Sequence, residues 1–600
     1  MRAYRATILL TALLAVLPLA VFGYSCGHDF DFHVLNWIEV AAHWRHGVLY
    51  PHWAASAAYG AGEPRFVFYP PLSWMLGALL GLLLPWSATP VAYTFLVLCG
   101  CGLSMYRLAR DWAAPSAALL AAVVYAANPY LLFTAYERTA YAELMAAVWL
   151  PLLFRAILRP RVTVSGIAIP VALLWLTNAP AAVMGCYALA VLALVRLAIG
   201  CIALKGHGFS RAIPAAEEEA SAPEGLNQVE QGTGSSARKI DRPDAPLQLA
   251  IKTAAGTALG LALAAIYIVP AAYERRWVQI KMAMVPGMRI QDSFLFGHTA
   301  DPDHDRVLWT ASWIALLLLA ATVAAAVVAL RRRLAAEPQK APFSTRGPAL
   351  ALCVLAAILC FLQMPISLAL WSHAPELAFL QFPWRWLAVL SVATALLLAF
   401  AVRDMHRWHL WRIGVVALPL ILIPPAYAAF HQGCDAEDTI PVALQLFRLG
   451  AGTAPTDEYT PLAADNDVLK HSMPSAALTD SIDGPLSPAV GEVVVADRAA
   501  EHWRLSATSS HAQFLVLRLR DYPAWKVRVN GALLRSRPQR NDGLMVLPIS
   551  AGASAIDVEY GATSDQRMGD AISAAALLVL LAMRQRRRRA GRGAGASAAG

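Results

Sequence analysis

Charged residues are scarce in this chain of 600 residues. Asp, Glu, Lys and Arg make up 15% of it, and 58% of the residues are hydrophobic, whereas typical soluble domains contain about 25% charged residues. Long uncharged stretches alternate with short charged ones, which is typical of a polytopic membrane protein. The composition therefore excludes an ordinary soluble globule, a disordered chain, a coiled coil and a collagen.

Two further features are missing: a basic face for nucleic acid and a cysteine framework. The net charge is +9, but Lys and Arg lie mostly at the ends of apolar segments, where such charge sets membrane topology. The eight cysteines have no metal-binding or disulfide-framework spacing. Six lie in apolar segments, where cysteine is a small hydrophobe. For Cys26 and Cys434 the sequence leaves a bridge open.

Twelve apolar segments are predicted to cross the membrane. The first, residues 6–27, follows Arg2 and Arg5 and is long enough for a bilayer of about 30 Å. Its poor cleavage site predicts a retained helix with a cytoplasmic N-terminus. The later spans are expected near residues 90–108, 116–133, 144–158, 163–177, 181–201, 250–270, 309–330, 347–368, 384–402, 412–430 and 570–583.

The apolar segment at residues 72–84 is too short to cross upright. Its 13 residues make about 20 Å of helix, so we expect a re-entrant or juxtamembrane segment. With this assignment both termini and every strongly basic loop fall on the cytoplasmic side, as the positive-inside rule requires. These basic clusters are Arg107/Arg110, Arg155/Arg159/Arg161, Lys205/Arg211, Arg331–Arg333, Arg403/Arg407/Arg412 and Arg586–Arg589.

The predicted fold class is an all-α polytopic membrane protein with a C-terminal periplasmic antiparallel β-sandwich. Asn530-Gly531 is a strong hairpin signal, and alternating segments predict strands at 492–497, 502–508, 513–520, 525–529, 544–549 and 555–560. The expected regions are a membrane module at 1–202 with a first outer loop at 25–70, a disordered cytoplasmic linker at 203–249, a second membrane module at 250–430, an outer domain at 431–568, and a final helix with a basic tail at 569–600.

Two carboxylates open the first outer loop, in Gly27-His28-Asp29-Phe30-Asp31-Phe32-His33. In an extended segment, residues two apart point the same way. Asp29 and Asp31 would then favour a cation or a cationic group between them, so we expect that they could share a divalent cation such as Mg or Mn. The alternative is a solvated loop end, because short motifs are weak signals.

Two arginines at predicted outer helix ends are candidates for binding phosphate. Arg138 lies between Glu137 and Glu143, and its planar guanidinium suits phosphate, while Glu143 could be a second catalytic carboxylate. Arg385 is bracketed by two tryptophans and runs against the positive-inside trend, which binding of a lipid-linked phosphate would explain. Anchoring at the interface and snorkelling are the alternatives.

The layout resembles the multi-pass glycosyltransferases of the GT-C structural class, which carry an acidic motif just after the first span. It resembles more closely a bacterial membrane-protein family labelled 6-pyruvoyl-tetrahydropterin synthase-related. That label implies no pterin chemistry here, since the reaction needs a soluble zinc site and the sequence offers no suitable His triad. The matching pieces are Asp29-Phe30-Asp31-Phe32-His33, Phe68-Tyr69-Pro70-Pro71, Ala126-Ala127-Asn128-Pro129-Tyr130, Tyr136-Glu137-Arg138-Thr139-Ala140-Tyr141-Ala142-Glu143 and Phe379-Leu380-Gln381-Phe382-Pro383-Trp384-Arg385-Trp386.

The resemblance implies a glycosyltransferase of the bacterial inner membrane that takes a sugar from a polyprenyl-phosphate donor to a glycan, lipid or protein acceptor. Asp29 or Asp31 would be the general base, and Arg138 and Arg385 would stabilise the leaving phosphate. The sequence shows no glycine-rich nucleotide loop after a strand, which fits a lipid-linked donor. The other expected substrate-binding residues are His28, His33, Arg65 and Glu137.

Two other functions stay open at this point. A transporter or flippase of a lipid-linked glycan predicts ionisable residues in mid-span and corresponding broken helices in two halves, and the sequence shows neither. A non-catalytic assembly protein predicts that changes at Asp29 and Asp31 leave activity untouched.

Overall fold

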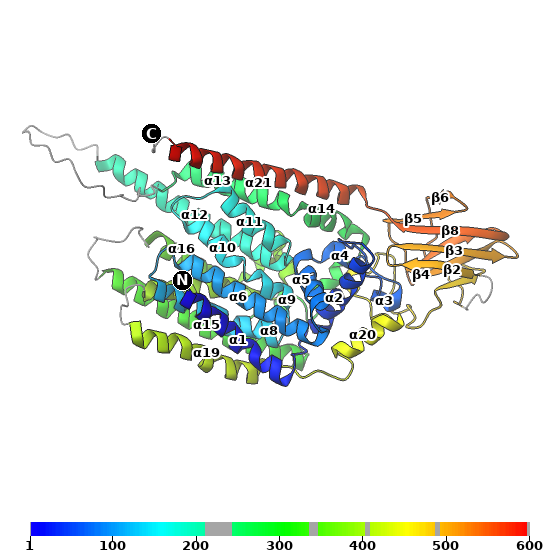
Figure 1. Ribbon diagram of the computed structural model, residues 1–600, viewed down its shortest axis with the longest axis horizontal. Coiled ribbons are helices and arrows are strands. Elements are labelled where there is room, and N and C mark those ends of the chain that lie inside the picture. The colour runs from blue at the N-terminus through cyan, green and yellow to red at the C-terminus, as the bar shows by residue number, and fades with distance from the viewer. Residues whose placement is uncertain (1, 211–242, 335–345, 403–407, 487–492, 597–600) are drawn as a thin grey trace, which may run out of the picture.

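A computed structural model describes residues 2–210, 243–334, 346–402, 408–486 and 493–596. Long helices lie side by side along the longest axis, and the β-strands project from one end of them (Figure 1). The start of the first helix and the end of the last both lie toward the opposite end, separated by other helices (Figure 1). The chain therefore has a helical bundle and a separate strand-rich end.

The bundle combines long helices with several broken ones. Its elements are α1 (Arg2–Phe22), α6 (Thr89–Ala109), α7 (Pro115–Ala126), α8 (Pro129–Tyr136), α9 (Tyr141–Ala146), α10 (Leu150–Leu158), α11 (Val164–Trp175), α12 (Ala179–Ser210), α13 (Pro246–Leu263), α14 (Ala265–Glu274), α15 (Pro302–Leu334), α16 (Arg346–Leu362), α17 (Leu368–His373), α18 (Leu387–Ala401), α19 (Trp408–Phe430) and α21 (Ser564–Ala596).

The predicted count of twelve spans is not confirmed. Within the described ranges, eight helices are long and apolar enough to cross a membrane, or ten if each of two bent pairs is one span. In the first pair the chain bends by 73° between α13 and Ala265–Trp277, which includes α14. In the second it bends by 95° between α16 and Pro365–His373, which includes α17. At two of the predicted spans the structure has shorter apolar helices, Val164–Trp175 and Ala417–Phe430.

Ion pairs bring two of the predicted basic loops together at one end of the bundle. Asp111 accepts hydrogen bonds from Arg155 at 2.9 Å and from Arg159 at 2.7 Å. These residues come from the predicted basic loops after α6 and after α10, so the structure places both loops at the same end. Asp244, next to α13, accepts from the backbone N–H of Val162 at 2.7 Å and thereby joins this end.

The first outer loop folds into short helices: α2 (Phe30–Arg45), α3 (Ala57–Gly60), α4 (Arg65–Phe68) and α5 (Pro71–Leu83). The 13 residues of α5 make it one of the shorter apolar helices, below the length of a span, which agrees with the predicted non-spanning segment. It packs closely against α2, since a Cβ on Gly77 would lie 2.3 Å from the ring of Trp37.

The strand-rich end is a sandwich of two antiparallel sheets with the orders β1-β4-β7 and β2-β3-β8-β5-β6. Leu515 and Leu517 of one sheet share a buried cluster with Val527 and Val558 of the other, so the core lies between them. All six predicted strands are present, and two short strands, β1 and β6, are additional. The strands are β1 (Ala476–Thr479), β2 (Val493–Ala499), β3 (His502–Ser509), β4 (Gln513–Arg520), β5 (Trp525–Val529), β6 (Ala532–Leu534), β7 (Leu544–Ile549) and β8 (Gly552–Tyr560).

The predicted linker at 203–249 falls largely outside the described residues, which omit 211–242. Its described edges are partly helical, since α12 continues to Ser210 and α13 begins at Pro246. A further helix, α20 (Ile440–Leu449), lies between the bundle and the sandwich (Figure 1).

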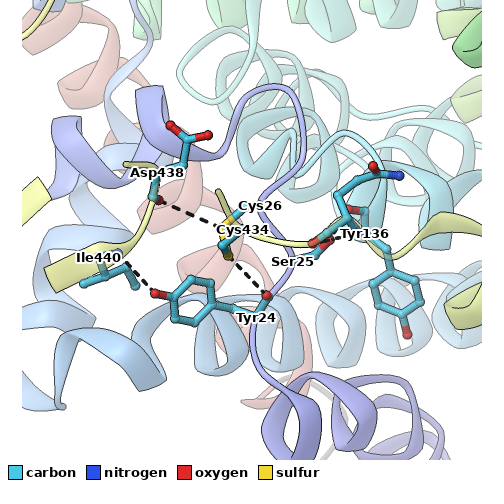
Figure 2. The surroundings of a disulfide bond; sticks show 8 residues. Tyr24, Ser25, Cys26, Tyr136, Cys434, Asp438 and Ile440 are labelled. Atoms are coloured by element: carbon cyan, nitrogen blue, oxygen red, sulfur yellow. Dashed lines mark hydrogen bonds between the residues drawn. A yellow bond between two sulfur atoms is a disulfide. The ribbon is translucent and has the colours of Figure 1, made fainter. Parts of the chain in front are cut away.

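Cys26 and Cys434 form a disulfide (Figure 2), the bridge that the sequence left open. It joins the segment after α1 to the segment after α19, across 408 residues of sequence. Beside it, Ser25 Oγ donates to the carbonyl of Tyr136 at 2.6 Å, and the Cys26 N–H donates to the carbonyl of Gln432 at 3.1 Å. The chain just before Asp29 is thus fixed to two other segments.

Candidate functional site

A cavity of about 550 Å³ lies between the first outer loop, the adjoining helix ends and the chain near Tyr459. Cavities of about 300–1,000 Å³ with a few convergent polar groups are typical of ligand sites. The ionisable side chains that line it are Asp29, His33, Arg138, Glu143, Arg275, Glu376, Arg385 and Glu458. Aromatic and aliphatic side chains form the remaining walls, among them Phe68, Trp175, Val183, Tyr267, Ile268 and Phe379.

Arg138 is held at the cavity by a break between two helices. Asn128 caps α8 by accepting from the N–H groups of Tyr130 and Leu131 at 2.9 and 3.0 Å, and Pro129 suits the first helical position. This cap starts a short helix that ends at Tyr136. The turn that follows carries Arg138, which is 5% exposed.

Arg138 and Arg385 share the carboxylate of Glu143. Arg138 Nη1 donates to Glu143 Oε2 at 2.7 Å, and Arg385 Nε lies 3.5 Å from the same oxygen. The other oxygen of Glu143 accepts from the Tyr130 hydroxyl. Arg138 is buried and the Arg385 side chain is 12% exposed, and both lie beside Glu143, while Asp29 also lies within 3.7 Å of Arg138. Guanidinium groups suit an anionic ligand because they form charge-assisted hydrogen bonds with it.

Aromatic faces cover the two arginines. The Arg138 guanidinium carbon lies 4.8 Å from the centre of the Trp384 ring, and that of Arg385 lies 4.9 Å from the centre of the Phe382 ring. Such cation–π contacts fix the guanidinium planes. Arg385 also donates to the carbonyl of Leu380 at 2.9 Å.

Asp29 is an accessible acidic group beside Arg138. Its side chain is 43% exposed, and its carboxylate lies 3.7 Å from Arg138 Nη2. Its backbone N–H donates to the Arg138 carbonyl at 2.9 Å. Gly27 permits this approach, because a Cβ there would lie 2.0 Å from the carbonyl oxygen of Glu137. The acid and the arginines predicted from the sequence therefore line one cavity.

The expectation that Asp29 and Asp31 point the same way is wrong. The segment is helical from Phe30, with Asp29 at the N-cap position. Residues two apart on a helix point about 200° apart, whereas on a strand they share a face. Asp31 is exposed and does not line the cavity.

The expected shared divalent cation does not fit these side chains. Among the described residues, no group of three or more His, Cys, Asp or Glu side chains could hold a metal ion. Two of the cavity's carboxylates, Asp29 and Glu143, are already beside Arg138. Guanidinium groups, rather than a cation, supply the positive charge here.

Three other predicted substrate-binding residues lie away from the cavity lining. His28 is exposed. Glu137 accepts from Gln432 Nε2 at 2.6 Å. Arg65 is buried and donates to Glu63 at 2.7 Å and to Asn36 and Thr456 at 3.0 Å each, so its donors are engaged in joining the outer loop to the segment before the sandwich.

His33 does line the cavity, and it is buried. Burial lowers its pKa to about 4, so the imidazole is neutral at neutral pH. Its ring packs edge-on against Tyr69 and Tyr141, with centroids 5.9 and 5.4 Å away. Its role in substrate binding stays a prediction, and the side chain is that of a neutral hydrogen-bonding or packing group.

Sequence reasoning missed several lining or supporting residues. Tyr130 follows Asn128-Pro129, a pair that predicts a capped helix start. That pattern does not predict that the Tyr130 hydroxyl donates to Glu143. Glu458 lies far along the chain in the segment before the sandwich, and burial raises the pKa of its carboxyl. Nothing in the local pattern around Glu458 indicates that it meets the first outer loop.

Comparison with known proteins identifies no family for this chain. No family model and no curated protein matches the chain, so the resemblance to the 6-pyruvoyl-tetrahydropterin synthase-related family finds no support there. Solved structures of the Archaeoglobus fulgidus oligosaccharyltransferase are similar at 15% identity: the apo form has a TM-score of 0.38 and the complex with Zn and sulfate one of 0.36.

The matched region covers 76% of this chain in both cases, but 60% of the apo oligosaccharyltransferase chain and 58% of the chain in the complex. The chain thus matches about three fifths of the length of those proteins. At these TM-scores the likeness carries no conclusion about activity.

Proposed function

We propose that this chain is an integral-membrane glycosyltransferase that transfers a sugar from a polyprenyl-phosphate donor to an acceptor at the periplasmic face of a bacterial inner membrane. The observation that carries the proposal is one cavity at the helix ends, lined by an accessible carboxylate, Asp29, and by two arginines, Arg138 and Arg385. The acceptor is a hydroxyl group of a glycan, a lipid or a protein.

The arginine pair suits the leaving group. Sugar transfer from a lipid phosphate releases a phosphate whose negative charge increases as the sugar–oxygen bond breaks. Arg138 and Arg385 are already oriented by Glu143 and by aromatic rings. Such preorganised donors stabilise developing charge without reorganisation in the transition state.

Asp29 suits the role of general base because its carboxylate reaches the cavity while its backbone is fixed. The acceptor oxygen attacks the anomeric carbon, the carbon–oxygen bond to the phosphate breaks, and the acceptor proton passes to Asp29. A single displacement of this kind inverts the anomeric centre. The lipid phosphate leaves with the bonding electrons, next to the arginines.

The apolar part of the cavity suits the lipid. Its walls come from ends of predicted membrane helices, with Trp175 on α11, Val183 on α12 and Ile268 on α14. A prenyl chain could therefore lie against the bundle while its phosphate reaches the arginines. This arrangement supports a lipid-linked donor over a water-soluble nucleotide sugar.

The disulfide supports the periplasmic side. Disulfides persist in oxidising compartments and are rare in the cytosol, and Cys26 lies three residues before Asp29. The basic loops at the other end of the bundle fit the cytoplasmic side. We therefore assign the cavity to the periplasm and both termini to the cytoplasm.

The test is sugar transfer by the full-length protein in liposomes with a panel of polyprenyl-phosphate sugars. Asp29→Asn is expected to lower the rate about 10²–10⁴-fold, the range for loss of a general base. Asp31→Asn is the matched control, because Asp31 lies outside the cavity lining, and it is expected to stay within twofold of wild type as an order-of-magnitude bound. Unchanged transfer by Asp29→Asn, or no transfer from any lipid phosphate sugar, would overturn the proposal.

A further inference from the structure

One charged side chain in the cavity lining has no partner of opposite charge. Besides the neutral His33, the charged side chains among the described residues that line the cavity are Asp29, Arg138, Glu143, Arg275, Glu376, Arg385 and Glu458. All of them except Glu458 take part in ion pairs with another member of this set. Within the described part of the chain, no other residue donates a hydrogen bond to the Glu458 carboxylate.

The carboxylate of Glu458 is open to the cavity. The side chain is half-buried and lines the cavity, and neither of its oxygens is among the enclosed atoms without a partner in the described residues. Burial raises the pKa of this carboxyl, and the nearby Glu63 and Asp457 raise it further. A ligand group that donates a hydrogen bond would offset these costs, whereas an anionic group would add repulsion.

The position of Glu458 is fixed by the residues on both sides of it, which contact the first outer loop. Thr456 Oγ1 accepts from Arg65 Nη2 at 3.0 Å. The Tyr459 ring stacks on that of Phe68, with centroids 5.6 Å apart. The carboxylate is therefore held in place before any ligand binds, which lowers the entropic cost of binding.

Two tyrosines of the lining connect Glu458 with Asp29. Burial raises the pKa of Tyr69, and the charge of Asp29 raises it further, while Arg385 lowers it. Burial also raises the pKa of Tyr459, and here Glu458 and then Tyr69 raise it further. Tyr69 thus adjoins the base and the arginines, and Tyr459 adjoins both Tyr69 and Glu458. The two acids belong to different ends of one cavity.

This separation suits the two substrates of a displacement. The attacking oxygen and the leaving phosphate lie on opposite faces of the anomeric carbon, so a phosphate beside Arg138 and Arg385 leaves the other side of the cavity to the acceptor. One acceptor hydroxyl reacts beside Asp29. A hydrogen bond to Glu458 then requires a second donor on the same acceptor.

A sugar supplies that second donor. A lipid alcohol has only the hydroxyl that reacts, whereas a sugar ring carries several. The aromatic side chains Phe32, Phe68 and Tyr459 line the cavity near Glu458, and their apolar surface suits the carbon–hydrogen face of a sugar ring. The polar and apolar parts of a sugar can therefore both be satisfied here.

We propose that Glu458 binds the acceptor of the transfer reaction, and that this acceptor is a sugar whose second hydroxyl donates to the Glu458 carboxylate. The inference rests on the proposed function and narrows its acceptor from a glycan, a lipid or a protein to a glycan. Glu458 takes no part in the proton transfer, since the proton of the reacting hydroxyl passes to Asp29.

Saturation-transfer NMR on the full-length protein in detergent tests the binding without turnover. The probes are the methyl glycosides of glucose, galactose, mannose and N-acetylglucosamine, with 1-octanol and N-acetyl-serine amide for comparison. Glu458→Gln and Glu458→Ala are each expected to weaken binding of the preferred glycoside by about tenfold, the effect of losing a hydrogen bond to a charged group. The matched control is Glu437→Gln, because Glu437 is exposed and lies outside the cavity lining.

Transfer kinetics separate acceptor binding from a structural role. In the liposome assay, Glu458→Gln should raise the KM for the acceptor sugar by about tenfold, while release of the donor sugar to water without acceptor stays within about twofold of wild type. A residue needed only for folding would lower both rates. Glu437→Gln should change neither.

The result expected is binding of at least one glycoside by wild type and by Glu437→Gln, with weaker binding in both Glu458 variants. Equal binding by those variants, binding of octanol or of the serine amide in place of the glycosides, or binding of no glycoside would overturn the inference. The proposed function fails separately, through absence of sugar release from every lipid phosphate donor. Release that depends on Asp29 but transfer that ignores Glu458 would overturn this inference alone.

Discussion

Arg138 Nη1 lies 2.7 Å from Glu143 Oε2, and both side chains are buried. The pair joins the turn after α8 to α9 at the wall of the cavity. Removing one partner of a buried ion pair leaves an uncompensated charge and costs about 3–5 kcal/mol. Glu143→Gln should therefore lower the free energy of unfolding by about that amount, measured by denaturant unfolding in detergent.

The control for that measurement is Glu376→Gln. Glu376 pairs with Arg275 at 3.3 Å, but both side chains are 49% exposed, and exposed pairs contribute about 0–1 kcal/mol. Similar losses in the two variants would contradict the view that the buried Glu143 is the shared counterion of Arg138 and Arg385.

The disulfide should matter for transfer as well as for stability. Removing a native disulfide typically costs about 2–4 kcal/mol. Because Cys26 lies three residues before Asp29, the double variant Cys26→Ser/Cys434→Ser should also lose transfer activity, as freedom of this segment misplaces the carboxylate. The measurement compares transfer rates of wild type with and without reductant.

In that comparison the double serine variant is the control, since it should not respond to reductant. Among the described cysteines no other pair forms a disulfide, so a reductant effect that persists in the double variant would show that another part of the assay is sensitive. Full activity in the double variant would contradict a positioning role.

Labelling of single cysteines checks which end of the bundle faces the periplasm. His28 and Arg107 are both exposed, at the start of the first outer loop and near the end of α6. In a background with Cys201→Ser, a membrane-impermeant maleimide should label His28→Cys in spheroplasts and should label Arg107→Cys only after permeabilisation. Labelling of both sites, or of Arg107→Cys alone, would contradict the assigned topology.

Much of the architecture is predictable because it depends on local pattern. The strands of the sandwich follow from period-two alternation, and the Asn530-Gly531 turn lies between β5 and β6. The non-spanning α5 follows from its length alone. Span counting is harder, because helices such as α13 bend at a break, and hydropathy does not reveal the angle between the two parts.

The candidate site was predictable in part for a similar reason. Arg138, Glu143 and Arg385 lie at helix ends on one side, so topology alone brings them together. The predicted direction of Asp31 was wrong because side chains two residues apart share a face on a strand, whereas on a helix they point about 200° apart. Long-range partners such as Glu458, and the pairing of Cys26 with Cys434, depend on tertiary packing and leave no local signal.

The buried His33 should make the protein sensitive to acid. Its pKa is about 4 in the folded chain because of burial, and about 6.5 when unfolded. Between these values the unfolded state binds a proton that the folded state does not, so stability is lost as pH falls from 6.5 to 4. The loss amounts to about 3 kcal/mol, at about 1.4 kcal/mol for each pKa unit.

Unfolding midpoints measured across this pH window test the effect. His33→Gln cannot take up that proton, so its stability should fall less steeply between pH 6.5 and 4 than that of wild type. The exposed His46 offers the control, and His46→Gln should keep the wild-type slope. Parallel pH profiles for wild type and His33→Gln would mean that other buried groups account for the acid sensitivity, and that the neutral imidazole in the cavity wall contributes nothing to it.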